Sequence, residues 1–291
     1  MTWRTIIVRE RAKLDYSLNF MTVRKEAEMR KISLSEIYMV IVESTAVSLT
    51  AVLLNELVKN KIKVVFCDEK RTPSSELLPY YGSHDTSLKY KYQLDWTEEC
   101  KQRVWTRIVY EKIYNQMLLL KKLNKDEYKL LEQYLNEIEW NDNSNREGHA
   151  AKVYFNALFG LDFSRNKECF VNAALNYGYS IILSAFNREI VSCGYFTQLG
   201  LCHKNPFNKF NLASDFMEPF RILVDEEVYN LEQSEFSKEH KNILINILNK
   251  TVAIDNKQQT VANAIKIYCR SLLTGLKEED LEYIKMYKYE L

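Results

Sequence analysis

The beginning of the chain alternates apolar and polar residues, which is the pattern of half-buried β-strands. Three segments show it, TWRTIIVRE (2–10), KLDYSLNFMTVRK (13–25) and RKISLSEIYMVIVES (30–44), and all are rich in Ile, Val, Thr and Tyr. Residues 50–60 (TAVLLNELVKN) change to helical spacing, and KIKVVFC (61–67) has the pattern of a buried strand. These segments predict a β-rich unit that contains one helix.

The hydrophobic period changes to 3.6 residues after a break in the pattern. Prolines, a glycine and several serines cluster in residues 68–85, and such clusters mark connections between domains. Beyond them, apolar residues recur at helical spacings. The predicted helices cover residues 98–120, 125–140, 146–159, 169–194 and 217–232. Pro219 predicts that Glu218 lies at a kink or at a helix start, because proline removes a backbone hydrogen bond.

The two patterns together predict an α+β protein, with a small N-terminal β-rich domain followed by a larger all-helical catalytic domain. We place the N-terminal domain at residues 1–75, a linker at 76–90 and the C-terminal helical domain at 91–291. Exposed strands in the β-rich part would allow pairing across a dimer, so we assign dimerisation to that domain.

Composition and charge exclude several classes of function. The 291 residues carry 40 Lys and Arg against 39 Asp and Glu, so the net charge of +1 requires any DNA-binding surface to be local. The absence of GxxxxGK[ST] and GxGxxG segments argues against nucleoside triphosphate and dinucleotide sites. The sequence shows no signal peptide, no apolar run of about 18 residues and no CxxC pair. We therefore expect a protein of the reducing cytoplasm, with no membrane partner.

Candidate metal ligands fall in two stretches of the helical part. One stretch contributes Glu147, and the other contributes His203, Asp215 and Glu218. Carboxylates combined with one imidazole suit Mg²⁺ or Mn²⁺ better than zinc, which usually recruits Cys or several His. Such a site is typical of phosphodiester chemistry.

Each candidate also has a purely structural explanation. Asp215 and Glu218 have the Asp-x-x-Glu spacing of a helix N-terminus. A single His203 can be an ordinary surface or core residue, and Glu147 can be a first-turn acid facing the positive end of a helix. We interpret Cys202 as a small packing residue, because a thiolate would favour zinc. The residues taken one by one leave these alternatives open.

The whole arrangement resembles the CRISPR-associated endonuclease that serves as the integrase of spacer acquisition. The resemblance is carried by SNREGHAAKVYF (144–155), NAALNYGYSIILSAF (172–186), GLCH (200–203) and SDFMEPFRILVD (214–225). It continues through VVFCDEKRTPSSELLPYYGSHDTS (64–87), which is similar to the version found in type II systems, and it covers nearly the whole chain.

The resemblance implies a catalytic site. The family's three metal ligands, which are also its catalytic residues, fall on Glu147, His203 and Glu218, with Asp215 as an accessory acid. The implied reaction is attack of a DNA 3′-hydroxyl on a phosphodiester of a CRISPR repeat, which inserts a new spacer in adaptive antiviral defence. Water in place of the hydroxyl would give endonuclease activity.

The resemblance also implies partners. These are DNA, a second copy of the chain, a small ferredoxin-like adaptation protein and, in type II systems, the effector nuclease and a ring-forming accessory protein. Two alternatives remain: a metal-dependent, structure-selective DNA nuclease without an integrase role, and a DNA-binding scaffold whose acids only cap helices.

Basic and aromatic residues near the motifs are candidates for DNA contacts. Arg and Lys bind phosphates, and Tyr can stack on a splayed base, although tyrosines on helical faces are more often core residues. The candidates are Arg146, Lys152, Tyr154, Arg165, Tyr177, Tyr179, Arg188, Lys204 and Arg221.

Overall fold

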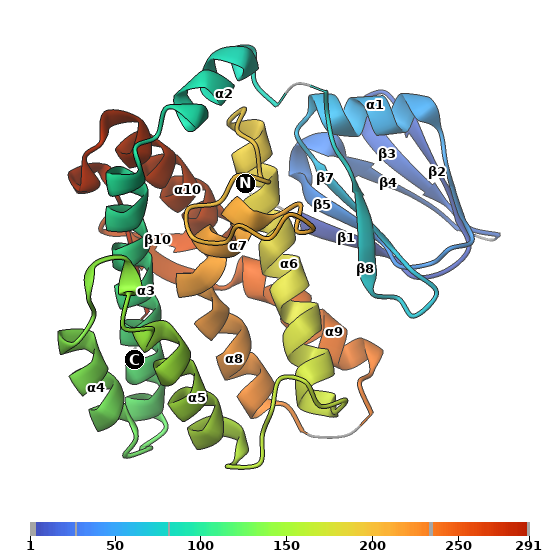
Figure 1. The fold of residues 1–291 in the computed structure, drawn as a ribbon. Coiled ribbons are helices and arrows are strands. Elements are labelled where there is room, and N and C mark those ends of the chain that lie inside the picture. The colour runs from blue at the N-terminus through green and yellow to red at the C-terminus, as the bar shows by residue number, and fades with distance from the viewer. Residues whose placement is uncertain (1–3, 27, 81, 233–234, 290–291) are drawn as a thin grey trace. The chain divides into compact units, whose positions relative to one another are not determined.

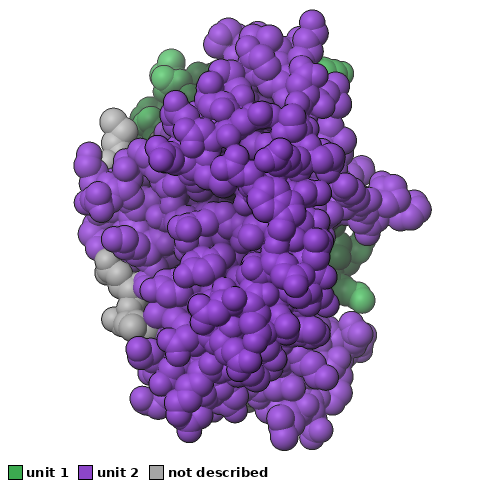
Figure 2. Space-filling model, turned by 60° about the vertical axis from the view of Figure 1, so that its left-hand side comes forward, with its two compact units in different colours: residues 1–82 green, residues 83–291 purple. Residues whose placement is uncertain are grey.

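The computed structural model describes residues 4–26, 28–80, 82–232 and 235–289, so the first two residues of the first predicted strand lie outside it. The chain forms two compact units, residues 1–82 and 83–291, which Figure 2 distinguishes by colour. As predicted, the protein is mixed α+β, with β-sheets in its N-terminal part and mostly helices in its C-terminal part (Figure 1).

One sheet of the N-terminal unit is mainly parallel. Its order is β1-β5-β7-β8, with β1, β5 and β7 parallel and β8 antiparallel at the edge. The strands are β1 (Arg4–Val8), β5 (Ile37–Val42), β7 (Lys63–Cys67) and β8 (Pro73–Leu77). Every residue of β5 (IYMVIV) is buried, as expected for a parallel strand covered on both faces.

The other sheet of this unit has the order β4-β3-β2-β6. Its strands are β2 (Ala12–Ser17), β3 (Phe20–Arg24), β4 (Met29–Ser33) and β6 (Val47–Leu49). Leu18 and Asn19 join β2 to β3, and both have positive φ, which suits a two-residue hairpin turn. Helix α1 (Ala51–Lys59) buries Leu53 and Leu57 in the core of this unit.

Two details of this unit differ from the prediction. The third alternating segment, residues 30–44, forms strands β4 and β5 in different sheets, separated by the 3₁₀ turn Leu34–Glu36. The predicted break at 68–85 contains strand β8, which begins with Pro73. Proline is tolerated there because β8 is an edge strand, so the missing N–H removes no hydrogen bond from the centre of the sheet.

The C-terminal unit is built from nine described helices. They are α2 (Thr86–Leu94), α3 (Glu98–Lys122), α4 (Tyr128–Asn136), α5 (Arg146–Phe159), α6 (Phe170–Ser192), α7 (Asn211–Met217), α8 (Arg221–Asn230), α9 (Lys238–Asn246) and α10 (Val261–Glu278). Figure 1 shows α8 between α3 and α6, and it packs against both. None of the helices in the described residues has the length and apolar content that a membrane span requires.

The prediction that this part is all-helical is wrong. Strands β9 (Thr251–Ile254), β10 (Lys257–Thr260) and β11 (Tyr287–Lys288) form an antiparallel sheet of order β10-β9-β11. Asp255 and Asn256 make the turn between β9 and β10, both at positive φ. Asp and Asn adopt this conformation more readily than other non-glycine residues, so this dipeptide is the sequence signal for the hairpin.

Aromatic rings fill the core beneath the candidate site. The centroid of Phe220 lies 5.2 Å from Phe186, 5.3 Å from Tyr268 and 4.2 Å from Tyr287. These rings join α6, α10 and β11 to the start of α8. The backbone next to Glu218 therefore rests on a packed, inflexible layer.

Candidate functional site

Glu147 lies in the first turn of α5, but another acid caps this helix. The Asp142 carboxylate accepts hydrogen bonds from the backbone N–H groups of Arg146 (2.8 Å) and Glu147 (3.0 Å). The Glu147 carboxylate points elsewhere, and its Oε1 lies 2.5 Å from Nζ of Lys112. Glu147 is thus a first-turn acid whose side chain serves a separate charged site.

Glu218 lies where two helices meet. Helix α7 ends at Met217, and the 3₁₀ turn Glu218–Phe220 leads into α8, because Pro219 has no N–H to continue the helical bonding. The Pro219 carbonyl accepts hydrogen bonds from Nδ2 of Asn115 (3.1 Å) and the hydroxyl of Tyr287 (2.7 Å). The predicted kink at Glu218 is therefore present, and two side chains hold it in place.

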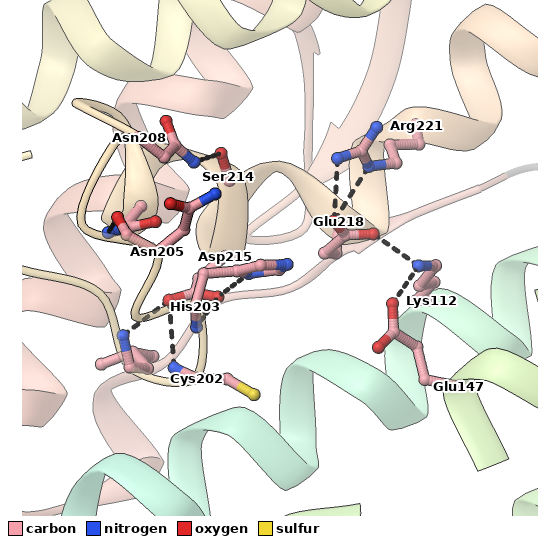
Figure 3. Close-up of polar contacts among 12 residues, drawn as sticks. Lys112, Glu147, Cys202, His203, Asn205, Asn208, Ser214, Asp215, Glu218 and Arg221 are labelled. Atoms are coloured by element: carbon pink, nitrogen blue, oxygen red, sulfur yellow. Dashed lines mark hydrogen bonds and ion pairs between the residues drawn. The ribbon is translucent and has the colours of Figure 1, made fainter. Parts of the chain in front are cut away.

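Two cations surround the Glu218 carboxylate, whose side chain is only 3% exposed. Nζ of Lys112 lies 2.6 Å from Oε2, while Nε and Nη2 of Arg221 each lie 2.9 Å from Oε1. Burial alone would raise the pKa of Glu218, but the charges of Arg221 and Lys112 outweigh it and lower the pKa to about 2. Glu218 is therefore ionised at neutral pH. Figure 3 shows Lys112 between Glu218 and Glu147.

His203 is oriented by a buried carboxylate. Asp215 is fully buried and accepts hydrogen bonds from the backbone N–H groups of Leu201 (2.6 Å), Cys202 (3.2 Å) and His203 (3.2 Å). Its Oδ1 also lies 2.5 Å from Nδ1 of His203. A Cβ at Gly200 would come within 2.5 Å of the His203 carbonyl oxygen, so only glycine allows this loop to wrap the carboxylate. Asp215 thus fixes both the loop and the imidazole.

The helix-capping explanation of the Asp-x-x-Glu pair is wrong. Asp215 lies inside α7, whose N-cap is Phe210, and Glu218 follows the end of that helix.

The hydrogen bond between His203 and Asp215 is the largest cause that raises the pKa of His203, and burial of the imidazole acts in the opposite direction. Because Nδ1 faces the carboxylate, Nε2 is the nitrogen left for a ligand.

Cys202 precedes His203 as an exposed residue, so its interpretation as a packing residue is wrong. Partial burial of the sulfur raises the pKa of its thiol to about 11, and the negative charges of Asp215 and Glu147 act in the same direction. A protonated thiol is a poor metal ligand. The environment of Cys202 therefore disfavours a thiolate beside His203.

The donor chemistry fits a hard divalent cation. Glu147 and Glu218 approach one positive charge from different elements, and a histidine held by a carboxylate is the usual arrangement behind a metal-bound imidazole. Across the described ranges, no three His, Cys, Asp or Glu side chains form a group that could hold a metal ion, and Lys112 stands between the two glutamates. The residues present are therefore of the types that bind a hard divalent cation, and the two glutamates converge on one point, which Lys112 fills in this structure.

Comparison with known sequences identifies the family. Residues 5–246 match the sequence model described as CRISPR associated protein Cas1. The chain belongs to the Cas1 family. The CRISPR-associated endonuclease Cas1 of Neisseria meningitidis serogroup C (strain 8013) is 32% identical over 292 residues, which cover 98% of this chain and 96% of the relative. The predicted family membership is thus confirmed.

Solved structures share the fold of this Cas1 protein. A chain of a Cas6-RT-Cas1–Cas2 complex matches with a TM-score of 0.77 and 18% identity, covering 100% of this chain and 36% of that longer chain. A casposase bound to integration product matches with a TM-score of 0.75 and 20% identity, covering 97% and 92% of the two chains.

The tyrosines predicted to stack on DNA bases are buried. Tyr154 is fully buried, and Tyr177 and Tyr179 are 3% and 8% exposed. The hydroxyl of Tyr154 donates to Oδ2 of Asp225 at 3.0 Å, and that of Tyr179 donates to Oδ1. No ring face is open to a base, so the stacking prediction is wrong for this conformation, and the alternative of core tyrosines with bonded hydroxyls holds for Tyr154 and Tyr179.

The arginines predicted to contact DNA are engaged within the protein. The pairs are Arg146–Glu137 (3.1 Å), Arg165–Asn172 (2.8 Å), Arg188–Glu189 and Arg221–Glu218 (2.9 Å). Lys152 and Lys204 are exposed residues, so their contact with DNA stays a prediction.

A cavity of about 510 Å³ opens beside His203. Lys101, Lys204 and Lys209 contribute to its lining, of which the sequence analysis named only Lys204. Phe207, which is 92% exposed, lies in the loop between His203 and Lys209 that contributes to this lining. Glu98 pairs with both Lys101 and Lys204 (3.8 Å), so its carboxylate partly balances the positive charge of the three lysines.

Lys112 is the functional residue that sequence reasoning missed. It follows Trp105, Ile108 and Val109 on one buried stripe of α3. A lysine that falls on the apolar stripe of a helix needs a partner of opposite charge when it is buried. This position of Lys112 was the sequence feature that could have marked it as part of a charged site.

Asp225 supports the site from behind. It is 1% exposed, and burial raises its pKa to about 6 although the Tyr179 and Tyr154 hydroxyls partly offset this. The guanidinium of Arg221, which holds Glu218, lies 4.7 Å over the Tyr179 ring. Asp225 therefore fixes the ring on which Arg221 rests.

We expect Asp225→Asn to change how stability depends on pH. The folded pKa of Asp225 lies above the unfolded value of 3.8, so the native state binds more protons and stability falls as pH rises from about 4 to 6. Asparagine removes this titration, so the stability of wild type relative to Asp225→Asn should fall by about 3 kcal/mol between about pH 3 and pH 7, of which about 2 kcal/mol is lost between about pH 4 and pH 6. Urea unfolding at several pH values measures it. A flat difference between wild type and Asp225→Asn across this pH range would contradict the prediction.

Proposed function

We propose that this Cas1 protein is a metal-dependent DNA integrase that joins a DNA 3′-hydroxyl to a phosphodiester of a CRISPR repeat and so inserts new spacers. The convergence of Glu147 and Glu218 on one cation, beside a histidine held by Asp215, carries the proposal. The name of the N. meningitidis relative as an endonuclease, and the casposase bound to integration product, support DNA strand chemistry at this site.

Glu147, Glu218 and Nε2 of His203 would hold Mg²⁺ or Mn²⁺. When bound, the ion would polarise the target phosphate and stabilise the charge that develops in the transition state. Asp215 keeps the imidazole oriented through Nδ1, and Arg221 holds Oε1 of Glu218 so that this carboxylate stays ionised. The protein supplies orientation and charge rather than a covalent nucleophile.

The reaction exchanges one phosphodiester for another. The 3′-hydroxyl of the incoming DNA gives up its proton and its oxygen forms a bond to the target phosphorus. The bond from that phosphorus to the 3′-oxygen of the target strand breaks, and this leaving oxygen takes up a proton, so the exchange is balanced. No external energy source is needed, in keeping with the absence of a P-loop sequence. Lys101, Lys204 and Lys209 around the cavity would bind phosphates next to His203.

Integration requires two strand joinings, at opposite ends of one repeat, so we propose that the protein works as a homodimer. The β-rich unit would mediate pairing, since its sheets end in strands with unpaired backbone groups. A structural neighbour comes from a complex whose name includes Cas2, which supports a partner protein here, and we propose that this partner is a small ferredoxin-like protein. For a type II system, the effector nuclease and a ring-forming accessory protein complete the proposed assembly.

A strand-transfer assay tests the function. A labelled duplex with free 3′-hydroxyls is incubated with a repeat-containing plasmid and the full-length protein, with and without the small partner, in EDTA, Mg²⁺, Mn²⁺ or Zn²⁺. We expect joined product only with Mg²⁺ or Mn²⁺, and at least as much with Mn²⁺, because Mn²⁺ accepts an imidazole ligand more readily. His203→Asp should shift any residual activity towards Mg²⁺.

The other outcomes separate the rival functions. Cleavage of branched DNA without joining would identify a structure-selective nuclease. Binding of DNA without metal and without products would identify a scaffold. Joining supported by zinc alone would overturn the proposed ligand set.

A further inference from the structure

Lys112 places its ammonium group between the two proposed glutamate ligands. Nζ lies 2.5 Å from Oε1 of Glu147 and 2.6 Å from Oε2 of Glu218. The lysine comes from the middle of α3, the glutamates from α5 and from the α7–α8 junction, and the lysine side chain is only 11% exposed. The ammonium group of Lys112 thus joins three elements through two ion pairs.

The ammonium and a metal ion compete for the same oxygens. A bound Mg²⁺ lies about 2.1 Å from each ligand oxygen, so an ion shared by Glu147 and Glu218 would fall in the space that Nζ of Lys112 fills. Glu218 already has Arg221 on its other oxygen. Adding a divalent ion to two cations around one buried carboxylate would create strong repulsion at low dielectric.

The two cations differ in their freedom to move. Arg221 makes two bonds to Oε1 of Glu218 and stacks on the Tyr179 ring at 4.7 Å, which fixes its planar group. Lys112 carries a compact charge on a flexible four-carbon stem, and it uses only its terminal nitrogen at the site. Lys112 is therefore the cation that can leave.

We propose that Lys112 is a resident counter-ion that holds Glu147 and Glu218 together in the metal-free protein and is displaced when the ion binds. The inference rests on the proposed metal-dependent function. Without a counter-ion, two carboxylates in a largely buried site would repel each other and spread apart. With it, the ligands stay assembled, and metal binding becomes an exchange of one cation for another.

Metal binding to the Lys112→Met protein tests the displacement. We expect full-length Lys112→Met to bind Mn²⁺ about tenfold more tightly than wild type in calorimetric titration, because the competing charge is gone. Its melting temperature without metal should be lower than that of wild type, and Mn²⁺ should raise it by more. The control is Lys122→Met, which removes a lysine that pairs with Glu226 at 3.1 Å, roughly 15 Å further along the same helix. This control should bind Mn²⁺ as wild type does.

Chemical labelling of the wild-type protein gives a second measurement that does not depend on the variant folding. Reductive methylation followed by mass spectrometry should leave Lys112 unmodified without metal and modify it in Mn²⁺, whereas Lys122 should react equally in both. Unchanged or weaker Mn²⁺ binding by folded Lys112→Met, or continued protection of Lys112 while wild type binds Mn²⁺, would overturn displacement and leave the integrase proposal intact. Wild-type protein that binds no Mn²⁺ would overturn both.

Discussion

Glu147→Gln protein should fold normally and lose strand transfer, by at least about 10³-fold, while Glu218→Gln should lose both strand transfer and stability. Both changes remove one negative ligand without changing side-chain size. They differ in burial, because the Glu147 side chain is 27% exposed and the Glu218 side chain is 3% exposed between Lys112 and Arg221. Breaking a buried pair leaves unbalanced charge, so Glu218→Gln should destabilise the fold by about 3–5 kcal/mol. Glu147→Gln should cost about 1 kcal/mol or less.

Joining assays and urea unfolding of the same preparations measure the two effects. Glu226→Gln is the matched control, since this glutamate of α8 pairs with a lysine of α3 but has no place in the site. It should join DNA at the wild-type rate. Normal joining by either ligand variant would remove that residue from the site, and equal stability of the two would show that Glu218 is not the main counter-charge for the buried cations.

Asp215→Asn should reduce joining by about 10- to 100-fold and destabilise the protein by about 3 kcal/mol. The carboxylate is fully buried and accepts three backbone N–H groups as well as Nδ1 of His203. An asparagine keeps only one acceptor oxygen and turns an NH₂ group towards these donors. The loss should therefore exceed the cost of about 1 kcal/mol expected for a helix cap.

A true helix cap provides the comparison for Asp215. The Thr260 side chain accepts from the backbone N–H of Asn263 at the start of α10. Thr260→Ala should cost about 1 kcal/mol and leave joining unchanged. If Asp215→Asn matched it in both measurements, Asp215 would have no role in positioning His203.

Local patterns predicted most elements of the fold but not their pairing. The 3.6-residue period located α3, α5 and α6 within a few residues, because each helix buries one long face. Sheet membership depends on contacts between distant segments. β5 pairs in parallel with β1 and β7, and no local signal distinguishes this from pairing with its neighbour β4. The β9–β10 hairpin was not predicted, because Lys257–Thr260 is polar throughout and lacks the alternation of apolar and polar residues that indicates a strand.

For the candidate site too, the sequence predicted the residues but not the contacts between them. Motif spacing selected Glu147, His203, Asp215 and Glu218, and the structure joins His203 to Asp215 directly and the two glutamates through Lys112. Burial could not be foreseen from the motifs. The tyrosine hydroxyls of α5 and α6 have their partner on α8, 71 and 46 positions away in sequence respectively, so the sequence did not distinguish surface from core tyrosines.

The hydrogen bond from Tyr287 to the Pro219 carbonyl also sets an order of events during synthesis. Tyr287 lies 68 positions after Pro219 in the sequence. At about 5–20 residues per second, a ribosome adds it roughly 3–14 s after the residues around Glu218 have been made. All the acids and the histidine of the site thus exist on the nascent chain before the bond that braces the α7–α8 junction can form. A growing chain therefore carries the site's residues before it has their finished geometry, and nucleic acid near the ribosome meets a braced site only after Tyr287 has been added.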